Sequence, residues 1–443
     1  MRLAILCLLA CAVVSWAAPL QKAFPYPYDQ YDLPNGLRLV TVPTDFPNVV
    51  ALYIVVQTGS RNEIEPGKSG FAHFFEHMMF RGTKAYPPEK YEAVMKAAGA
   101  ASNAYTTDDG TVYHATFSKE DFEKIFSMEA DRFQNLDYAE ANFRTEALAV
   151  LGEYNKNSSS PAQKLDEVLY DTAFDKHTYK HTTMGFLKDI EDMPNQYAYS
   201  RQFFDRWYRP EYTTVIVVGD VKADQIRALT GKYWGGWKRG SYRADIPAEP
   251  PQGGPRANQI AWPTQTLPWL AVAFHGPAYS DTQNDQATLD IISYLGFSQS
   301  SELYQKLVIQ EQKVDSLGAE NPDRMDPNLF TVLARVKDAA DLDAVREDIL
   351  AAFRKYQDTP VPKDRLEAVK SRLRYQFALG LDNSESIAET LAGYVGLRRT
   401  PETINRLYDL YAAVTPEDVQ RVAKKYFVDD GRVIVTLKGA GSK

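Results

Sequence analysis

Two of the six histidines of the chain, His73 and His77, stand four positions apart in the stretch SGFAHFFEHMMFRGT, with Glu76 between them. Residues 70–80 contain good helix formers and no proline, so we expect a helix there, with Ser69 as its N-cap. Residues i and i+4 share a face of a helix, so both imidazoles would point the same way. Two such imidazoles can bind zinc, and the Glu76 carboxylate can then reach a water molecule at the ion without being a ligand.

A catalytic zinc ion normally takes three protein ligands and keeps a fourth position for water, so another ligand is required. Residues 143–157 read as a helix and carry Glu146 and Glu153, which are seven positions, or about two turns, apart on one face. Either glutamate could complete a site for one zinc ion per chain.

Other interpretations of these residues exist. Two histidines and a glutamate also arise in this order by chance, and two acidic residues seven apart often form a solvated helix face. His177 and His181 are again four apart, but their neighbours indicate a loop, so they are a weaker candidate for a metal site. His114, in an alternating strand, and His275, at a strand end, are expected to be packing or surface residues.

The elements that must position the metal-binding residues follow from hydrophobic periodicity. Alternating apolar residues predict strands at 49–59 and 111–117, and an amphipathic pattern predicts a helix at 119–134. Strands and helices do not alternate strictly along the chain. We therefore expect an α+β fold in which helices pack on one face of mainly antiparallel sheets.

The chain reads as two similar halves related by duplication. Segments 203–220 and 419–439 repeat one plan, in which a helix is followed by an aromatic residue, a short turn and an apolar strand. Prolines and glycines crowd into residues 246–263, which predicts a linker. The linker would join a zinc-binding N-terminal half, 19–245, to a C-terminal half, 264–443.

The N-terminal residues have the pattern of a secretory signal peptide. Arg2 precedes an apolar run, and small residues stand before a cleavage point near residue 18. We expect residues 1–18 to be removed and the protein to reach the bacterial periplasm or the exterior. Cys7 and Cys11, the two cysteines of the chain, lie in this segment, so nitrogen and oxygen atoms must supply any metal ligands of the mature protein.

The charge and hydropathy of the chain argue against nucleic-acid binding and against a membrane-spanning helix. The formal net charge is −8 and no run of Lys and Arg occurs, which argues against nucleic acid. The apolar run near the N-terminus is shorter than the ~20 residues of a membrane-spanning helix, and no later segment approaches that length.

The sequence resembles the pitrilysin, insulin-degrading enzyme and mitochondrial processing peptidase family of zinc peptidases, the inverzincins. The likeness is carried by GFAHFFEHMMFRGT, by ASNAYTTDDGTVYHATF, by the pair of glutamates that follows, and by the two-half layout. It implies that His73, His77 and Glu153 bind zinc and that Glu76 is the general base of a metalloendopeptidase. It also implies that Glu146 supports the metal site.

The same resemblance implies how substrate binds. Members of the family hold a peptide as an added strand on a sheet edge, inside a chamber closed by two halves. Asn103, Ala104 and Tyr105 match that edge strand. The stretch SNAYTTDDG also reads simply as a strand that leads into a tight turn.

One segment departs from the family pattern. Self-sufficient members carry an arginine and, seven residues later, a tyrosine that stabilise the substrate carbonyl and the oxyanion. The corresponding positions in LVIQEQKVD hold Val308 and Asp315. We therefore expect a zinc endopeptidase for peptides or unfolded segments that acts in a heterodimer, with a homologous partner supplying the arginine and tyrosine. The alternative is a non-catalytic peptide-binding or assembly subunit of the same fold.

Overall fold

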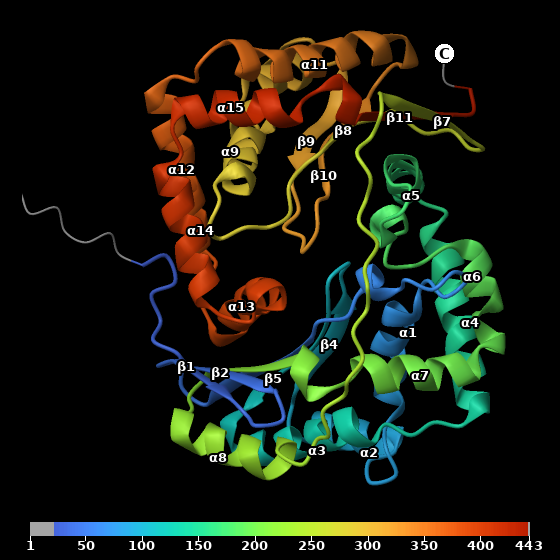
Figure 1. Ribbon diagram of the computed structural model, residues 1–443, viewed down its shortest axis with the longest axis vertical. Helices are drawn as coiled ribbons and strands as arrows, with labels where there is room; N and C mark the ends of the chain where they lie inside the picture. The colour runs from blue at the N-terminus through green and yellow to red at the C-terminus, as the bar shows by residue number, and fades with distance from the viewer. Residues whose placement is uncertain (1–21, 442–443) are drawn as a thin grey trace, which may run out of the picture.

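The computed structural model describes residues 22–441, so the expected signal peptide, 1–18, lies outside the described residues. Within this range the chain forms a six-stranded and a five-stranded sheet, each covered by helices (Figure 1). This arrangement confirms the α+β class and the two similar halves. Among the described residues, no helix is both long and apolar enough to cross a membrane.

The first sheet has the strand order β1-β2-β6-β3-β5-β4, and its neighbouring strands are antiparallel except for β2 and β6. Its strands are β1 (Asp29–Asp32), β2 (Arg38–Pro43), β3 (Val49–Val56), β4 (Ala101–Thr106), β5 (Thr111–Ser118) and β6 (Thr213–Gly219). The helices of this half are α1 (Phe71–Met78), α2 (Pro88–Ala97), α3 (Phe122–Asn135), α4 (Glu140–Asn157), α5 (Pro161–Ala173), α6 (Leu187–Asp192), α7 (Tyr197–Trp207) and α8 (Ala223–Trp234).

The second sheet has the order β7-β11-β8-β10-β9, with β7 and β11 as its parallel pair. Its strands are β7 (Arg256–Trp262), β8 (Trp269–His275), β9 (Val314–Glu320), β10 (Leu329–Val336) and β11 (Arg432–Gly439). Its helices are α9 (Asp285–Phe297), α10 (Glu302–Tyr304), α11 (Leu342–Asp358), α12 (Lys363–Leu379), α13 (Ser384–Arg398), α14 (Glu402–Ala413) and α15 (Pro416–Tyr426). The order matches β2-β6-β3-β5-β4 strand for strand, parallel pair included, as a duplication requires.

The central strand β3 is buried on both faces, which explains its continuous apolar sequence. Its even-numbered residues, Val50 to Val56, belong to a core that contains α1 and α3. Its odd-numbered residues, Ala51 to Val55, belong to a separate core that contains α13. The sheet next to α1, the helix that is expected to bind the metal, is therefore packed from both sides.

Each half contributes one helix that packs on the sheet of the other half. Helix α13 packs on β3 and β6 of the first sheet, whereas α5 packs on β7, β8 and β11 of the second (Figure 1). Small residues of β8, Ala271 and Ala273, make room for Leu165 and Leu169 of α5. Each half thus covers the sheet face that the other half's own helices leave open.

The segment expected to be a linker is only partly irregular. Residues 235–255 form no helix or strand and connect the two halves in an extended path (Figure 1). Arg256–Trp262, however, form β7, which pairs in parallel with β11. The prediction of a linker over 246–263 was wrong for residues 256–262, which form a strand because Ile260 and Trp262 pack against the core that contains α5.

Candidate metal centre and active site

Helix α1 begins after Gly70, whose φ of 90° lies in the left-handed region that glycine tolerates. The prediction that Ser69 is the N-cap was wrong: Gly70 occupies that position, and the Ser69 Oγ donates to the Asp189 carboxylate at 2.6 Å instead. The Glu63 carboxylate takes that role and accepts the backbone N–H groups of Gly70 and Ala72 at 2.7 Å each. These are N–H groups that the first turn of a helix leaves without partners.

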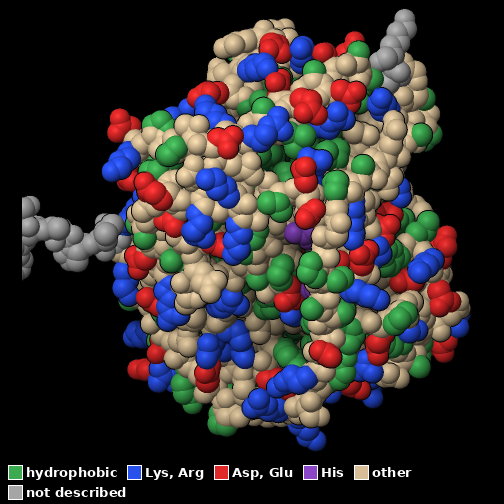
Figure 2. All heavy atoms as spheres, turned by 45° about the horizontal axis from the view of Figure 1, so that its top comes forward, with side chains coloured by type: hydrophobic (Ala, Val, Ile, Leu, Met, Phe, Trp, Pro, Cys, Tyr) green, Lys and Arg blue, Asp and Glu red, His purple; other side chains and the backbone are tan. Residues whose placement is uncertain are grey.

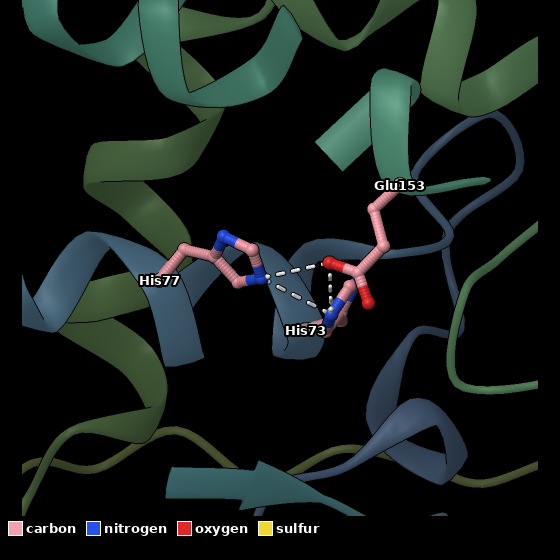
Figure 3. A group of neighbouring side chains, drawn as sticks. All are labelled: His73, His77 and Glu153. Carbon is pink, nitrogen blue, oxygen red and sulfur yellow. Dashed lines mark hydrogen bonds and ion pairs between the residues drawn. The ribbon is translucent and has the colours of Figure 1, made fainter. Parts of the chain in front are cut away.

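Aromatic side chains hold α1 in place. Phe71, Phe74 and Phe75 have no accessible surface, and the ring of Phe75 stacks on Phe203 with centroids 5.3 Å apart. These rings occupy the core-facing side of the helix. His73 and His77 therefore face Glu153 of the neighbouring α4 (Figure 3).

Three ligand atoms converge between α1 and α4. The Nε2 atoms of His73 and His77 are 3.3 Å apart, and Glu153 Oε2 lies 3.3 Å from His77 Nε2 and 3.6 Å from His73 Nε2 (Figure 3). Among residues 22–441, this is the one group of three His, Cys, Asp or Glu side chains that could hold a metal ion. Glu153, rather than Glu146, brings its carboxylate to the Nε2 atoms of both histidines.

The three separations fit a tetrahedral zinc ion. Ligand atoms about 2.1 Å from zinc stand about 3.4 Å from one another in that geometry. His77 Nδ1 lies 3.1 Å from Glu146 Oε1, and a carboxylate accepts, so Nδ1 carries the hydrogen and Nε2 presents a lone pair. That lone pair faces the His73 nitrogen and the Glu153 carboxylate. A bound cation would offset the repulsion among these electron-rich atoms.

The two imidazoles differ in their tendency to hold a proton. Burial, and then the neighbouring His77, lower the pKa of His73 to about 4, so His73 is neutral at neutral pH. The hydrogen bond with Glu146 raises the pKa of His77. A metal ion therefore competes with a proton chiefly at His77.

Glu146 and Arg81 support His77 from the side away from the ligand atoms. The Glu146 carboxylate lies 3.1 Å from His77 Nδ1 and accepts from Arg81 Nε at 2.5 Å. Burial alone would raise the pKa of Glu146, but these hydrogen bonds lower it. Glu146 is thus a charged acceptor that orients the His77 ring, and Arg81 is a functional residue that the sequence pattern did not reveal.

Glu76 lies beside the three candidate ligands and is not one of them. Its Oε2 accepts from Thr106 Oγ1 at 2.7 Å, and burial raises its pKa. A raised pKa suits a carboxylate that accepts and returns a proton near neutral pH. Thr106 was not predicted, since only the packing of β4 beside α1 brings it to Glu76.

The candidate substrate strand is an edge strand. Asn103, Ala104 and Tyr105 lie in β4, which ends the first sheet. Asn103 is exposed, whereas Ala104 is buried in the core with α1 and Tyr105 packs on the side of α13. The outer edge of β4 can accept another strand.

The remaining histidines have other partners. His177 Nε2 lies 3.0 Å from the Asp326 carboxylate, and His181 donates to a backbone carbonyl. His114 stacks on a tyrosine ring, and His275 donates to a backbone carbonyl of α5. Figure 2 shows histidine side chains next to acidic ones near the centre of one face of the molecule.

The two departures from the family pattern lie in the second half. Val308 belongs to a π-helical segment, Gln305–Gln310, that follows α10. Asp315 belongs to β9, and its carboxylate lies 3.3 Å from Arg335 Nη1. Neither side chain can replace an arginine or a tyrosine as a donor to substrate.

The fold and this constellation define a class of metallopeptidases. Residues 38–186 match the family model "Insulinase (Peptidase family M16)", and residues 196–373 match "Peptidase M16 inactive domain". The chain belongs to peptidase family M16. Glu76 and the three candidate metal ligands all fall within the first match.

Individual relatives agree with this assignment. The zinc protease PqqE of Helicobacter pylori is 28% identical, over 93% of this chain and 93% of its own. The crystal structure of a protease from Helicobacter pylori has a TM-score of 0.87 and 28% identity, covering 93% of this chain and 99% of that one. The mitochondrial-processing peptidase subunit beta of Blastocladiella emersonii is 24% identical, over 91% of this chain and 87% of its own.

Proposed function

We propose that this chain is a zinc-dependent endopeptidase that hydrolyses peptides or unfolded segments. One observation carries the proposal: His73, His77 and Glu153 present their ligand atoms at separations of 3.3, 3.3 and 3.6 Å, with the Glu76 carboxylate alongside. Membership of family M16 and the likeness to a named zinc protease support it.

His73, His77 and Glu153 would hold one zinc ion per chain. When bound, zinc polarises a substrate carbonyl and makes water a better nucleophile at neutral pH. Glu76 takes the proton of the attacking water and passes it to the leaving amine. Because Thr106 holds Oε2 of Glu76, Oε1 is left to carry that proton.

The edge of β4 would position the peptide. Backbone groups at Asn103, Ala104 and Tyr105 would pair with an extended substrate, as in other cases of strand addition. Thr106 continues the same strand and bonds Glu76. A peptide paired with β4 therefore passes directly beside the catalytic carboxylate.

We further propose that the chain acts with a homologous partner subunit. Val308 and Asp315 stand where donors to the oxyanion are needed, so the partner would supply the arginine and the tyrosine. The likeness to a protein named as a subunit of the mitochondrial-processing peptidase supports a divided enzyme. The signal-peptide pattern supports removal of residues 1–18 and a periplasmic or secreted location in a bacterium.

Replacing the catalytic carboxylate tests the proposal. Glu76→Gln is expected to retain one equivalent of zinc and to lose about 100- to 10,000-fold in peptide hydrolysis, because the amide cannot take a proton. Metal content by elemental analysis and cleavage of a peptide mixture, with and without the homologous partner, measure the two effects. The exposed Glu89→Gln serves as the control. Unchanged hydrolysis in Glu76→Gln, or a wild-type chain that binds no zinc, would contradict the assignment.

The alternative is a non-catalytic peptide-binding or assembly subunit, and Val308 and Asp315 favour it. In that case the zinc-loaded chain would bind peptides and cleave none of them, whether alone or with any homologous partner. Hydrolysis that disappears in Glu76→Gln would exclude this alternative.

A further inference from the structure

A cavity of about 380 Å³ lies in the second half of the chain, between α9, α10, α11 and the start of α12. Helix α10 contacts both α9 and α11, and α12 contacts α9 (Figure 1). Every residue that lines the cavity lies between 295 and 365, so the cavity shares no residue with the candidate metal centre. Its volume falls within the range of about 300–1,000 Å³ that is usual for small-molecule sites. We propose that it binds a fatty acid, with the carboxylate at Arg365 and the aliphatic chain inside the cavity.

The interior of the cavity is apolar. Leu295, Leu303 and Val361 line it, and all three are buried. Gly296 keeps the space beside them open, because a Cβ atom there would stand only 3.2 Å from the ring of Tyr356. These surfaces suit a hydrocarbon chain, which gains free energy for each methylene group that it buries.

The wall formed by residues 359–362 favours a hydrocarbon chain over a peptide. Its sequence is Thr-Pro-Val-Pro, and neither Pro360 nor Pro362 has a backbone N–H group. The facing wall belongs to α11, whose backbone groups bond one another within the helix. The carbonyl groups of a bound peptide would thus find few donors inside the cavity, whereas a hydrocarbon chain needs none.

The rim of the cavity carries a surplus of positive charge. Lys306 Nζ lies 2.7 Å from both carboxylate oxygens of Asp348, so this pair is balanced. Glu302, by contrast, serves two cations: its Oε2 accepts from Lys355 Nζ at 2.6 Å and its Oε1 accepts from Arg365 Nη1 at 3.4 Å. The Arg365 guanidinium therefore makes one long hydrogen bond and keeps its other N–H groups for a second carboxylate. The Glu302 side chain is 69% exposed, so it can turn toward solvent when that carboxylate arrives.

The hydroxyl of Tyr356 provides a neutral donor at the same place. Tyr356 lines the cavity, and within the part of the chain that the structure describes its hydroxyl has no hydrogen-bond partner. Burial raises the pKa of Tyr356 to about 12, so the hydroxyl keeps its hydrogen. Arg365 and Glu302 both influence that pKa, which places the hydroxyl near the guanidinium. A carboxylate held by Arg365 would therefore accept from Tyr356 as well.

Equilibrium dialysis of the purified chain against radiolabelled decanoate tests the site. We expect saturable binding of one decanoate per chain, and we expect hexanoate and octanoate to compete with affinities that rise up to about four-fold per methylene group. Decanol, which lacks the charge, should compete about five-fold more weakly than decanoate. Acetyl-leucine, which carries its carboxylate next to a peptide group, should compete no better than hexanoate.

Three variants locate the binding. Arg365→Gln should weaken the binding of decanoate about five-fold and remove its advantage over decanol. Ala352→Leu, which places a larger side chain in the cavity wall, should weaken decanoate and decanol alike by about ten-fold. Arg354→Gln is an exposed change of the same type on α11 that lies outside the cavity, and it should alter neither affinity. Urea unfolding of each variant checks that the fold is retained.

The proposal would be overturned by a lack of saturable binding, by equal affinity for decanoate and decanol, or by binding that is unchanged in Arg365→Gln or in Ala352→Leu. Tighter binding of acetyl-leucine than of octanoate would overturn the fatty acid as the occupant and assign the cavity to the C-terminal residue of a peptide. None of these measurements uses zinc or peptide hydrolysis, so their outcome is independent of the proposed function.

Discussion

At the scale of single residues, Glu146 governs how well His77 can serve as a ligand. Glu146 is 4% exposed, and its carboxylate stands between the imidazole of His77 and the guanidinium of Arg81. An acceptor at Nδ1 holds the hydrogen there and leaves the Nε2 lone pair for the metal. The affinity for zinc should therefore depend on a residue that does not touch the ion.

Glu146→Gln is expected to weaken zinc binding by about ten-fold, since the amide oxygen is a poorer acceptor for the imidazole and leaves Arg81 without its counter-charge. Competition with a chromogenic chelator measures the affinity. Glu140→Gln, an exposed change at the start of the same helix, should have no effect. Equal affinity in Glu146→Gln and the wild type would show that His77 needs no such support.

Spacing along the sequence was enough to identify the two histidines and the glutamate of α1. The side chains that support them are revealed only by contacts between distant segments. His73, Glu76 and His77 could be predicted because one helical turn determines their relation. Thr106 and Arg81 could not, because their partners lie 30 and 65 positions away in sequence and because both residue types are common on surfaces. No single-sequence pattern marks such a contact.

At the scale of elements, the start of α1 depends on the Glu63 carboxylate. Glu63→Ala would leave the N–H groups of Gly70 and Ala72 buried without an acceptor, at a cost of about 1–3 kcal/mol for each. We expect a lower free energy of unfolding by urea and weaker zinc binding, because the turn that carries His73 would shift.

Glu63→Gln provides the matched comparison, since its amide oxygen can still accept one of the two N–H groups. It should recover part of the lost stability and part of the lost zinc affinity. Equal stability of Glu63→Ala and the wild type would mean that the aromatic packing alone holds the helix.

The elements themselves were predictable to different degrees. Hydrophobic periodicity placed β5 and α3, whose burial alternates along their length, and it also placed β3, although β3 is buried continuously rather than alternately. Helix α1 was expected because its residues are good helix formers without proline. Helix α13 mixes apolar and small residues on several faces, which indicates burial but not which sheet covers it. The helix exchange with α5 is a long-range property, and β7 escaped notice because prolines and glycines precede it.

At the scale of the whole molecule, the loop between β9 and β10 ties the second half to the active site. Arg324 Nε donates to Asp108 at 2.6 Å, in the turn that joins β4 to β5. In the same loop, Asp326 accepts from Arg61 Nε at 2.5 Å, and His177 Nε2 lies 3.0 Å from its carboxylate. The turn after the strand that carries Thr106 is thus held by Arg324 of the second half, and the loop that carries Arg324 is held in turn by Arg61 and His177 of the first half.

The contact at Asp326 predicts how acid should affect this bracing. Burial by itself would raise the pKa of Asp326, but hydrogen bonds from His177 and Arg61 lower it to about 2. A carboxyl whose pKa in the folded state lies below its unfolded value of about 3.9 contributes stability above that value, and the contribution is lost as pH falls through the folded pKa. Asp326→Asn should therefore lower Tm at pH 7, and the difference from wild type should shrink between about pH 4 and pH 2.

Calorimetric unfolding of both proteins across this range measures the effect, with Asp343→Asn, whose side chain is 85% exposed, as the control. If the difference in Tm between Asp326→Asn and the wild type stayed constant down to pH 2, the charge of Asp326 would not be what stabilises the contact. The same variant should also reduce hydrolysis at neutral pH, because a looser β4–β5 turn weakens the hold of Thr106 on Glu76. Stability and activity would then fall together through a contact that involves no catalytic residue.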